Sequence, residues 1–236
     1  MKVKSFRAPR LVVASLAQGR IILRGFWFLV CAWKWLGLGL LIVATAVVFL
    51  MMPYDPGLLA QLHIWRGDQD DVARQISRVF SICGDYPQYN VTLALAIWLY
   101  GVWSKSSAWR RIAMVCFLGS SLAGLFDDGF RMTVGRPRPD TGFPDHFYGI
   151  TNALHGTFQS FPSGHAATAF GTAAALLVVD LPLGLITTLY ALAVIWARME
   201  LYRHYPSDII VGSIIGIYFG LMVGFGAKVR SPRPPK

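Results

Sequence analysis

Residues 209–227, IIVGSIIGIYFGLMVGFGA, form an apolar run whose length decides the fold class. A helix of about 20 apolar residues crosses the ~30 Å hydrocarbon core of a bilayer. Further apolar runs precede this one, at about 36–52, 89–103, 112–126, 165–179 and 182–197. We therefore predict an all-α, polytopic membrane protein with six transmembrane helices.

The composition of the whole chain supports this class. The 236 residues are 55% hydrophobic and 14% charged, and the net charge is +10. With six spans, the side that holds both termini carries most of the 22 Lys and Arg residues and a single acid, Asp180. Since Lys and Arg mark the cytoplasmic side, we expect both termini inside and the long connections, about 53–88 and 131–162, outside. The bases are spread over short loops and tails, which argues against a nucleic-acid surface.

The apolar runs divide the chain into three parts. Residues 1–35 are expected to form a basic cytoplasmic segment, in which the apolar stretch 11–23 is interrupted by Arg20 and favours an interfacial helix. Residues 36–228 are the expected six-helix membrane domain. The basic, Pro-rich residues 229–236 are expected to be a cytoplasmic tail.

The outer connection contains one amphipathic segment. Its apolar residues recur at helical spacing, and two aspartates just before them are placed to cap a helix. The residues are Val72, Ile76, Val79 and Phe80, preceded by Asp70 and Asp71. The pattern predicts a helix along the outer membrane surface, and a lid or strut without chemistry is the simpler interpretation.

The charged residues at the outer ends of the spans are the candidates for function. Charge at membrane depth is costly, so it usually faces a protein interior or a wet cavity. In DDGFRMTVGRPRP, residues 127–139, glycine and proline end the third helix. Guanidinium groups near this end suit an oxyanion such as phosphate. They belong to Arg131, Arg136 and Arg138. For Arg131 the alternative is an ion pair with Asp127, four residues away on one helical face.

A second cluster opens the fourth helix, in FPSGHAATAF, residues 161–170. Ser163 and Gly164 are expected at the helix start, where free N–H groups and the positive end of the dipole bind anions. Ser163 adds a hydroxyl donor, and Gly164 allows close approach of the backbone. His165, in the first turn, can then protonate a leaving group. A purely structural histidine is the alternative.

A third cluster lies between the fifth and sixth spans, in ARMELYRHYPSD, residues 197–208. Pro206 fits the first helical position, which places Asp208 at the third. From there the carboxylate can reach back over the helix start toward His204. An aspartate that holds one imidazole nitrogen leaves the other free as a nucleophile or base. Arg198 supplies another anion-binding fork, and a helix-dipole partner is the alternative for Asp208.

Together the three clusters resemble the signatures of the type 2 phosphatidic acid phosphatase (PAP2) superfamily, in its membrane lipid phosphatase branch. These signatures read KxxxxxxRP, PSGH and SRxxxxxHxxxD, and all three spacings are present here in order. The resemblance extends over about 85–226. Two positions differ, because Arg131 stands in place of the lysine and Ala197 in place of the leading serine. Neither difference puts the reaction class in doubt.

The resemblance implies metal-free phosphate transfer through a phosphohistidine, without a cofactor. By this resemblance His204 attacks phosphorus, Asp208 orients it, and His165 protonates the leaving oxygen. The remaining residues would bind the phosphate oxygens. They are Arg131, Arg138, Ser163, Gly164 and Arg198.

The expected activity is hydrolysis of a phosphate monoester or diphosphate of a membrane lipid, with water as acceptor. Polyprenyl diphosphate, lipid A, phosphatidylglycerol phosphate and phosphatidate all fit a site at the outer face of a bacterial inner membrane. A lipid-linked phosphotransferase would use the same residues with another acceptor. An anion transporter would need charges across the whole membrane, and here they stop at the outer ends.

Overall fold

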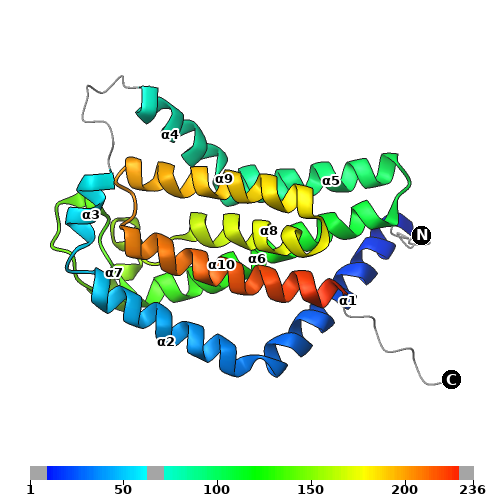
Figure 1. Cartoon of the computed structure of the whole chain (residues 1–236), viewed down its shortest axis with the longest axis horizontal. Coiled ribbons are helices and arrows are strands. Elements are labelled where there is room, and N and C mark those ends of the chain that lie inside the picture. Colours follow the sequence, from blue (N-terminus) through cyan, green and yellow to red (C-terminus); the bar gives the residue numbers. More distant parts are fainter. Residues whose placement is uncertain (1–9, 63–71, 229–236) are drawn as a thin grey trace, which may run out of the picture.

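The computed structural model describes residues 10–62 and 72–228, and every regular element in these two ranges is a helix (Figure 1). The predicted tail 229–236, residues 1–9 and the expected capping aspartates Asp70 and Asp71 lie outside them. The elements are α1 (Arg10–Ala32), α2 (Lys34–Met51), α3 (Asp55–Leu62), α4 (Val72–Cys83), the π-helical η1 (Pro87–Val91), α5 (Thr92–Trp103), α6 (Ser107–Val134), η2 (Pro139–Thr141), α7 (Ile150–Ala153), η3 (Gly156–Phe158), α8 (Gly164–Val179), α9 (Leu181–Glu200) and α10 (Pro206–Lys228).

The chain is an all-helical, multi-pass membrane protein, as predicted. All six apolar runs lie on helices, and α2, α6, α9 and α10 are long and apolar enough to cross a membrane. In the described residues α1 also meets this criterion, whereas α8 has 16 residues and α5 has 12. The number of six spans therefore stays a prediction.

The N-terminal helix is longer than the interfacial helix predicted for 11–23. It continues to Ala32, and it buries Ile22 and Phe26 in an apolar cluster with Val223 of α10. A Cβ on Gly25 would collide with the backbone of α10, so the two helices are in close contact. Whether α1 lies in the interface, and whether a boundary at residue 35 separates it from the domain, stay predictions.

The core of the bundle is the contact between α8 and α10. Along α10 the glycines recur every fourth residue, at 212, 216, 220 and 224, and they face α8. A Cβ on Gly216 would collide with the Ala167 carbonyl, and one on Gly220 would lie 2.5 Å from the Gly171 carbonyl oxygen. Small residues allow helix backbones to approach this closely. The contact places the first turns of the two helices side by side.

The helix boundaries near the predicted clusters follow the local sequence. α6 ends at Val134, and Gly135 follows with φ 64°, a conformation that favours glycine. α8 begins at Gly164 and α10 at Pro206, as predicted. α6 extends beyond the expected 112–126, so Arg131 lies on its last turns rather than in a loop.

Helix α4 begins at Val72, where the amphipathic pattern predicted a helix. It buries Ser77 and Ser81 and leaves Val72, Ile76 and Val79 exposed. Gly84, just after it, lies against Val194 of α9. The apolar face is therefore free to contact lipid, although its position along the membrane surface stays a prediction.

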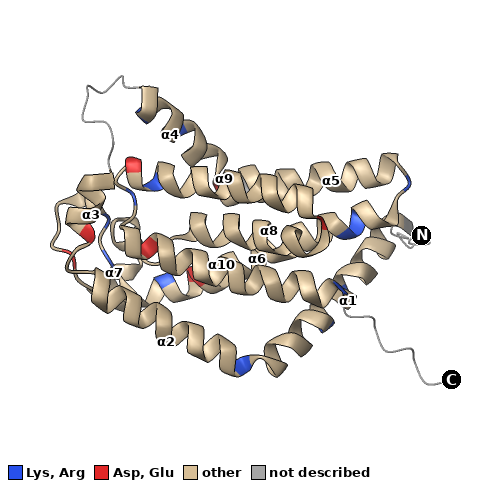
Figure 2. Cartoon of the chain, in the orientation of Figure 1, with Lys and Arg blue, Asp and Glu red and all other residues tan. Residues whose placement is uncertain are grey.

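The two ends of the bundle differ in charge. Asp and Glu residues gather toward the end that holds α3 and α7 (Figure 2). The first turn of α1 and the last turn of α10 lie at the opposite end (Figure 1). The orientation of the chain in a membrane stays a prediction.

Candidate active site

The three sequence clusters meet at the end of the bundle near α3 and α7. The rings of His165 and His204 have their centroids 6.5 Å apart. A Cβ on Gly164 would lie 3.3 Å from Nη1 of Arg131, which places the end of α6 against the start of α8. The Ser163 N–H donates a 3.2 Å hydrogen bond to the Asp208 carbonyl, which joins the starts of α8 and α10.

The candidate nucleophile, His204, is 1% exposed and held by one backbone contact. Its Nδ1 lies 2.7 Å from the carbonyl oxygen of Ser160. A carbonyl only accepts hydrogen bonds, so Nδ1 carries the proton and Nε2 keeps its lone pair. Burial, together with the positive charges of Arg198 and Arg138 and with His165, holds the pKa of His204 well below its usual value. The imidazole is therefore neutral at neutral pH.

The predicted direct contact between Asp208 and His204 is wrong in its geometry. The carboxylate lies 3.9 Å from Nδ1, beyond hydrogen-bond distance. It accepts instead from the Tyr205 N–H at 2.9 Å, the Ser160 hydroxyl at 2.6 Å and Arg136 at 2.5 Å. The bond to Tyr205 is the reach back over the helix start that the sequence predicted. The Ser160 carbonyl occupies the place at Nδ1 that the carboxylate was expected to take.

The start of α8 presents unpaired donors. Ser163 is the N-cap residue, and its hydroxyl is buried without a hydrogen-bond partner among the described residues. The first N–H groups of a helix also have no partners within the helix. A buried hydroxyl without a partner costs free energy, so a ligand that accepts from it would be stabilised here. This agrees with the predicted role of Ser163 and Gly164.

Arg138 and Arg198 also carry unpaired donors. The Nε atoms of both are buried without a hydrogen-bond partner within the described ranges. Nη1 of Arg198 donates to the Ser81 hydroxyl at 2.5 Å, so α4 helps to hold this guanidinium. Burial and the nearby charges of Arg203 and Arg131 lower the pKa of Arg138. An anion between these cations would relieve their repulsion and satisfy their donors.

Arg131 pairs with Asp128 rather than with Asp127. The alternative ion pair expected from the four-residue spacing is therefore wrong. Asp127 is fully buried, and neither of its oxygens has a hydrogen-bond partner in the described part of the chain. Arg131 keeps its place beside Gly164, where it can also reach a bound phosphate.

Variants of Arg131 distinguish a phosphate ligand from an ion-pair partner. If Arg131 binds phosphate, Arg131→Ala should lose roughly 10²-fold in turnover, whereas Arg131→Lys should retain substantial activity because a point charge still contacts the anion. Asp128→Asn is the matched control, since it breaks the same ion pair and should leave turnover near wild type. Specific activity and thermal unfolding in detergent measure both effects. A destabilised Arg131→Ala whose folded fraction is fully active would remove Arg131 from the site.

Asp85, between α4 and η1, is a site residue that the motif spacing did not reveal. Its Oδ1 lies 2.8 Å from Nε2 of His165. This contact, with Arg198 and Arg138 nearby, lowers the pKa of Asp85. An ionised carboxylate at this distance favours a proton on Nε2 of His165 over one on Nδ1. The signal was available, because Asp85 is an acid just before an apolar run.

Arg136 is the main correction to the predicted anion-binding arginines. It was expected to suit an oxyanion together with Arg131 and Arg138, but it is fully buried and bound to Asp55, Asp145 and Asp208. It therefore has no donor left for a phosphate. Asp55 comes just after the first predicted span, and this position of a charged residue at a span end was the one feature of the sequence that pointed to a role for it.

Known proteins resemble parts of this chain. The family model described as PAP2 superfamily matches residues 112–225. A lipid A 1-phosphatase of Rhizobium johnstonii is 34% identical over 117 residues, 47% of this chain and 46% of that protein. A lipid A 4'-phosphatase of Bacteroides thetaiotaomicron is 36% identical over 108 residues, 44% of this chain and 48% of that protein. The chain thus spans about half the length of the curated relatives it matches.

A solved structure has the same fold. The crystal structure of the first transmembrane PAP2 type phosphatidylglycerolphosphate phosphatase from Bacillus subtilis has a TM-score of 0.53 and 17% sequence identity. The match covers 81% of this chain and 93% of that chain. The range 112–225 contains all three sequence clusters and both histidines. Over residues 112–225, just under half of its length, the chain is similar to the PAP2 superfamily.

Proposed function

We propose that this protein is a membrane lipid phosphatase that acts through a phosphohistidine intermediate. One observation carries the proposal. A buried, neutral His204 lies in the field of Arg138 and Arg198, and among the described residues its Nε2 and the Nε donors of both arginines have no hydrogen-bond partner. Such a group is a nucleophile toward an anion that the arginines hold in place.

The proposed reaction has two steps on the same phosphorus. Nε2 of His204 attacks, the bond from phosphorus to the lipid oxygen breaks, and His165 gives its proton to that oxygen. Water then attacks the phosphohistidine, its proton passes to His165, and the bond to Nε2 breaks to release inorganic phosphate. Arg131, Arg138 and Arg198 stabilise the oxygens in both transition states.

The proposed substrate is a lipid A phosphate. Relatives named as lipid A phosphatases share 34% and 36% identity over stretches of 117 and 108 residues. A helix start at the end of an apolar bundle brings the phosphate of a lipid to the site while its chains stay in the bilayer. The distribution of Lys and Arg supports termini in the cytoplasm and a site on the outer face. The membrane we propose is a bacterial inner membrane, because the relatives named as lipid A phosphatases come from bacteria.

Phosphate release from a lipid panel tests this function. The purified protein in detergent is given lipid A, a polyprenyl diphosphate, phosphatidylglycerol phosphate and phosphatidate, each with excess EDTA. We expect release to be fastest from lipid A and unchanged by EDTA, because arginines and a helix N-terminus bind the phosphate. Orthovanadate should inhibit by occupying the same site. Activity that is lost with EDTA and restored by Mg²⁺, or no release from any lipid, would contradict the proposal.

A further inference from the structure

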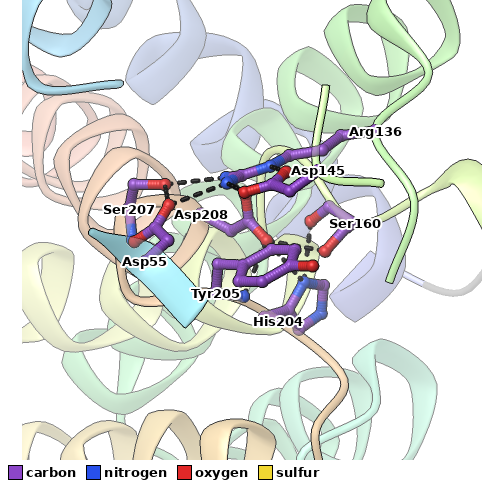
Figure 3. A network of polar contacts seen from close by, with 8 residues as sticks. All are labelled: Asp55, Arg136, Asp145, Ser160, His204, Tyr205, Ser207 and Asp208. Carbon is purple, nitrogen blue, oxygen red and sulfur yellow. Dashed lines mark hydrogen bonds and ion pairs between the residues drawn. The ribbon is translucent and has the colours of Figure 1, made fainter. Parts of the chain in front are cut away.

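An ion cluster in which Arg136, Asp55 and Asp208 are fully buried lies directly behind the nucleophile (Figure 3). At its centre Arg136 uses all five of its N–H donors. Nε and Nη2 bind Asp145 at 2.7 and 2.6 Å, and Nη2 also binds Asp55 at 2.7 Å. Nη1 donates to Asp208 at 2.5 Å and to the Ser207 hydroxyl at 2.7 Å. A guanidinium with every donor occupied has one orientation.

The cluster reaches His204 through Ser160 from two directions. The Ser160 N–H donates to the Arg136 carbonyl at 3.0 Å, and the Ser160 hydroxyl donates to Asp208 at 2.6 Å. The remaining polar group of Ser160, its carbonyl, accepts from Nδ1 of His204. Tyr205, the residue after His204, covers the guanidinium of Arg136, and the centre of its ring lies 4.3 Å from the guanidinium carbon. Within the described ranges, the hydrogen bond that orients the imidazole therefore comes from a serine that is itself held by the Arg136 carbonyl and by Asp208.

Asp55 connects this cluster to the distant N-terminal part of the chain. It lies on α3, just after α2, and it is fully buried. Its Oδ1 accepts from the Ser207 N–H at 3.1 Å, and its Oδ2 accepts from Arg136 and from the Ser207 hydroxyl. A carboxylate at the start of α10 is also favoured by the helix dipole. Asp55 thus holds both the guanidinium and the helix that carries Asp208.

We propose that Arg136, Asp55 and Ser160 are positioning residues that aim Nε2 of His204 at phosphorus, with the Ser160 carbonyl in direct contact with the nucleophile. Asp208 then acts on His204 through Ser160. This proposal rests on the proposed function and assigns a task to the connection that follows α2. A small displacement of a reacting group can cost about 10²-fold in rate, so residues that fix the orientation of the His204 imidazole can have a large effect on turnover.

Asp55→Asn is the sharpest test, because it keeps the side-chain size and removes one of the three carboxylate charges that bind Arg136. We expect kcat on the best lipid of the panel to fall about 10-fold or more, with KM within about twofold of wild type, since the phosphate-binding arginines are untouched. The formation of acid-labile phosphohistidine, followed by rapid quench, should slow by the same factor. Asp140→Asn is the matched control, because it breaks an exposed ion pair with Arg203 (2.9 Å) at the rim. It should leave all three quantities unchanged.

Ser160→Ala provides an independent second variant. It removes the hydroxyl that binds Asp208 and keeps the carbonyl that binds His204, so it should also lower kcat and the rate of phosphohistidine formation at unchanged KM. For both variants, kcat and the rate of phosphohistidine formation are divided by the amount of folded protein, which thermal unfolding in detergent defines. A loss of stability is then not mistaken for a misoriented imidazole. If one variant does not fold, the other decides.

The proposed positioning role is overturned if a folded variant forms phosphohistidine at the wild-type rate, or if KM alone changes. A wild-type protein without activity on any lipid would instead contradict the proposed function. The two failures are therefore distinguishable.

Discussion

Replacement of His204 by alanine should lower phosphate release by about 10⁴-fold or more, because it removes the protein atom proposed to form a bond to phosphorus. No phosphohistidine should form when the variant is mixed with the lipid and quenched with base. His155→Ala is a suitable control, since His155 is an exposed histidine of the same outer connection. A His204→Ala protein with near-normal release would contradict the mechanism.

The pH dependence of the wild-type enzyme follows from the same residue. Burial, Arg198, Arg138 and His165 lower the pKa of His204 well below its usual value of 6.5, and the neutral form is the nucleophile. The fraction of neutral His204 therefore stays high as the pH falls through 6.5 and declines only well below it. The acid limb of the kcat/KM profile should lie in that lower range.

Replacement of Arg198 by alanine should cost about 10²- to 10³-fold in kcat/KM, the typical effect of removing one donor to a developing negative charge. Arg198 is 7% exposed, and its Nε has no hydrogen-bond partner in the described part of the chain, so a bound phosphate can accept from it. Inhibition by orthovanadate should weaken in parallel, because the same donor binds the inhibitor.

Two further variants show whether Arg198 acts through several directed hydrogen bonds or only through its positive charge. Arg198→Lys should remain strongly impaired, since an ammonium cannot contact Ser81 and the phosphate together. Ser81→Ala removes only the hydroxyl that accepts the hydrogen bond from Nη1 of Arg198, so it should lower kcat/KM less than Arg198→Ala does. An Arg198→Ala protein with unchanged kcat/KM and unchanged vanadate inhibition would exclude Arg198 from the phosphate site.

The sequence by itself determined the features that depend on neighbouring residues. The long apolar runs predicted the membrane class, because crossing a hydrocarbon core requires only length and apolarity. Gly135 ended α6, and Gly164 and Pro206 opened α8 and α10 as predicted, since these residues act on their own backbone. The spacing of the three clusters also identified the residues that converge at the site.

The tertiary structure alone decided which polar groups meet. Arg136 and Asp55 are 81 residues apart, and they meet because of the packing of α3 against the start of α10. The contact to Nδ1 of His204 comes from the backbone carbonyl of Ser160, and every residue has such a carbonyl, so no pattern in the sequence could point to it. Pairings of this kind depend on the separation and orientation of whole helices, here α8 and α10 in close contact along small residues. The separation between two helices is a property of the packed bundle rather than of any local stretch of sequence.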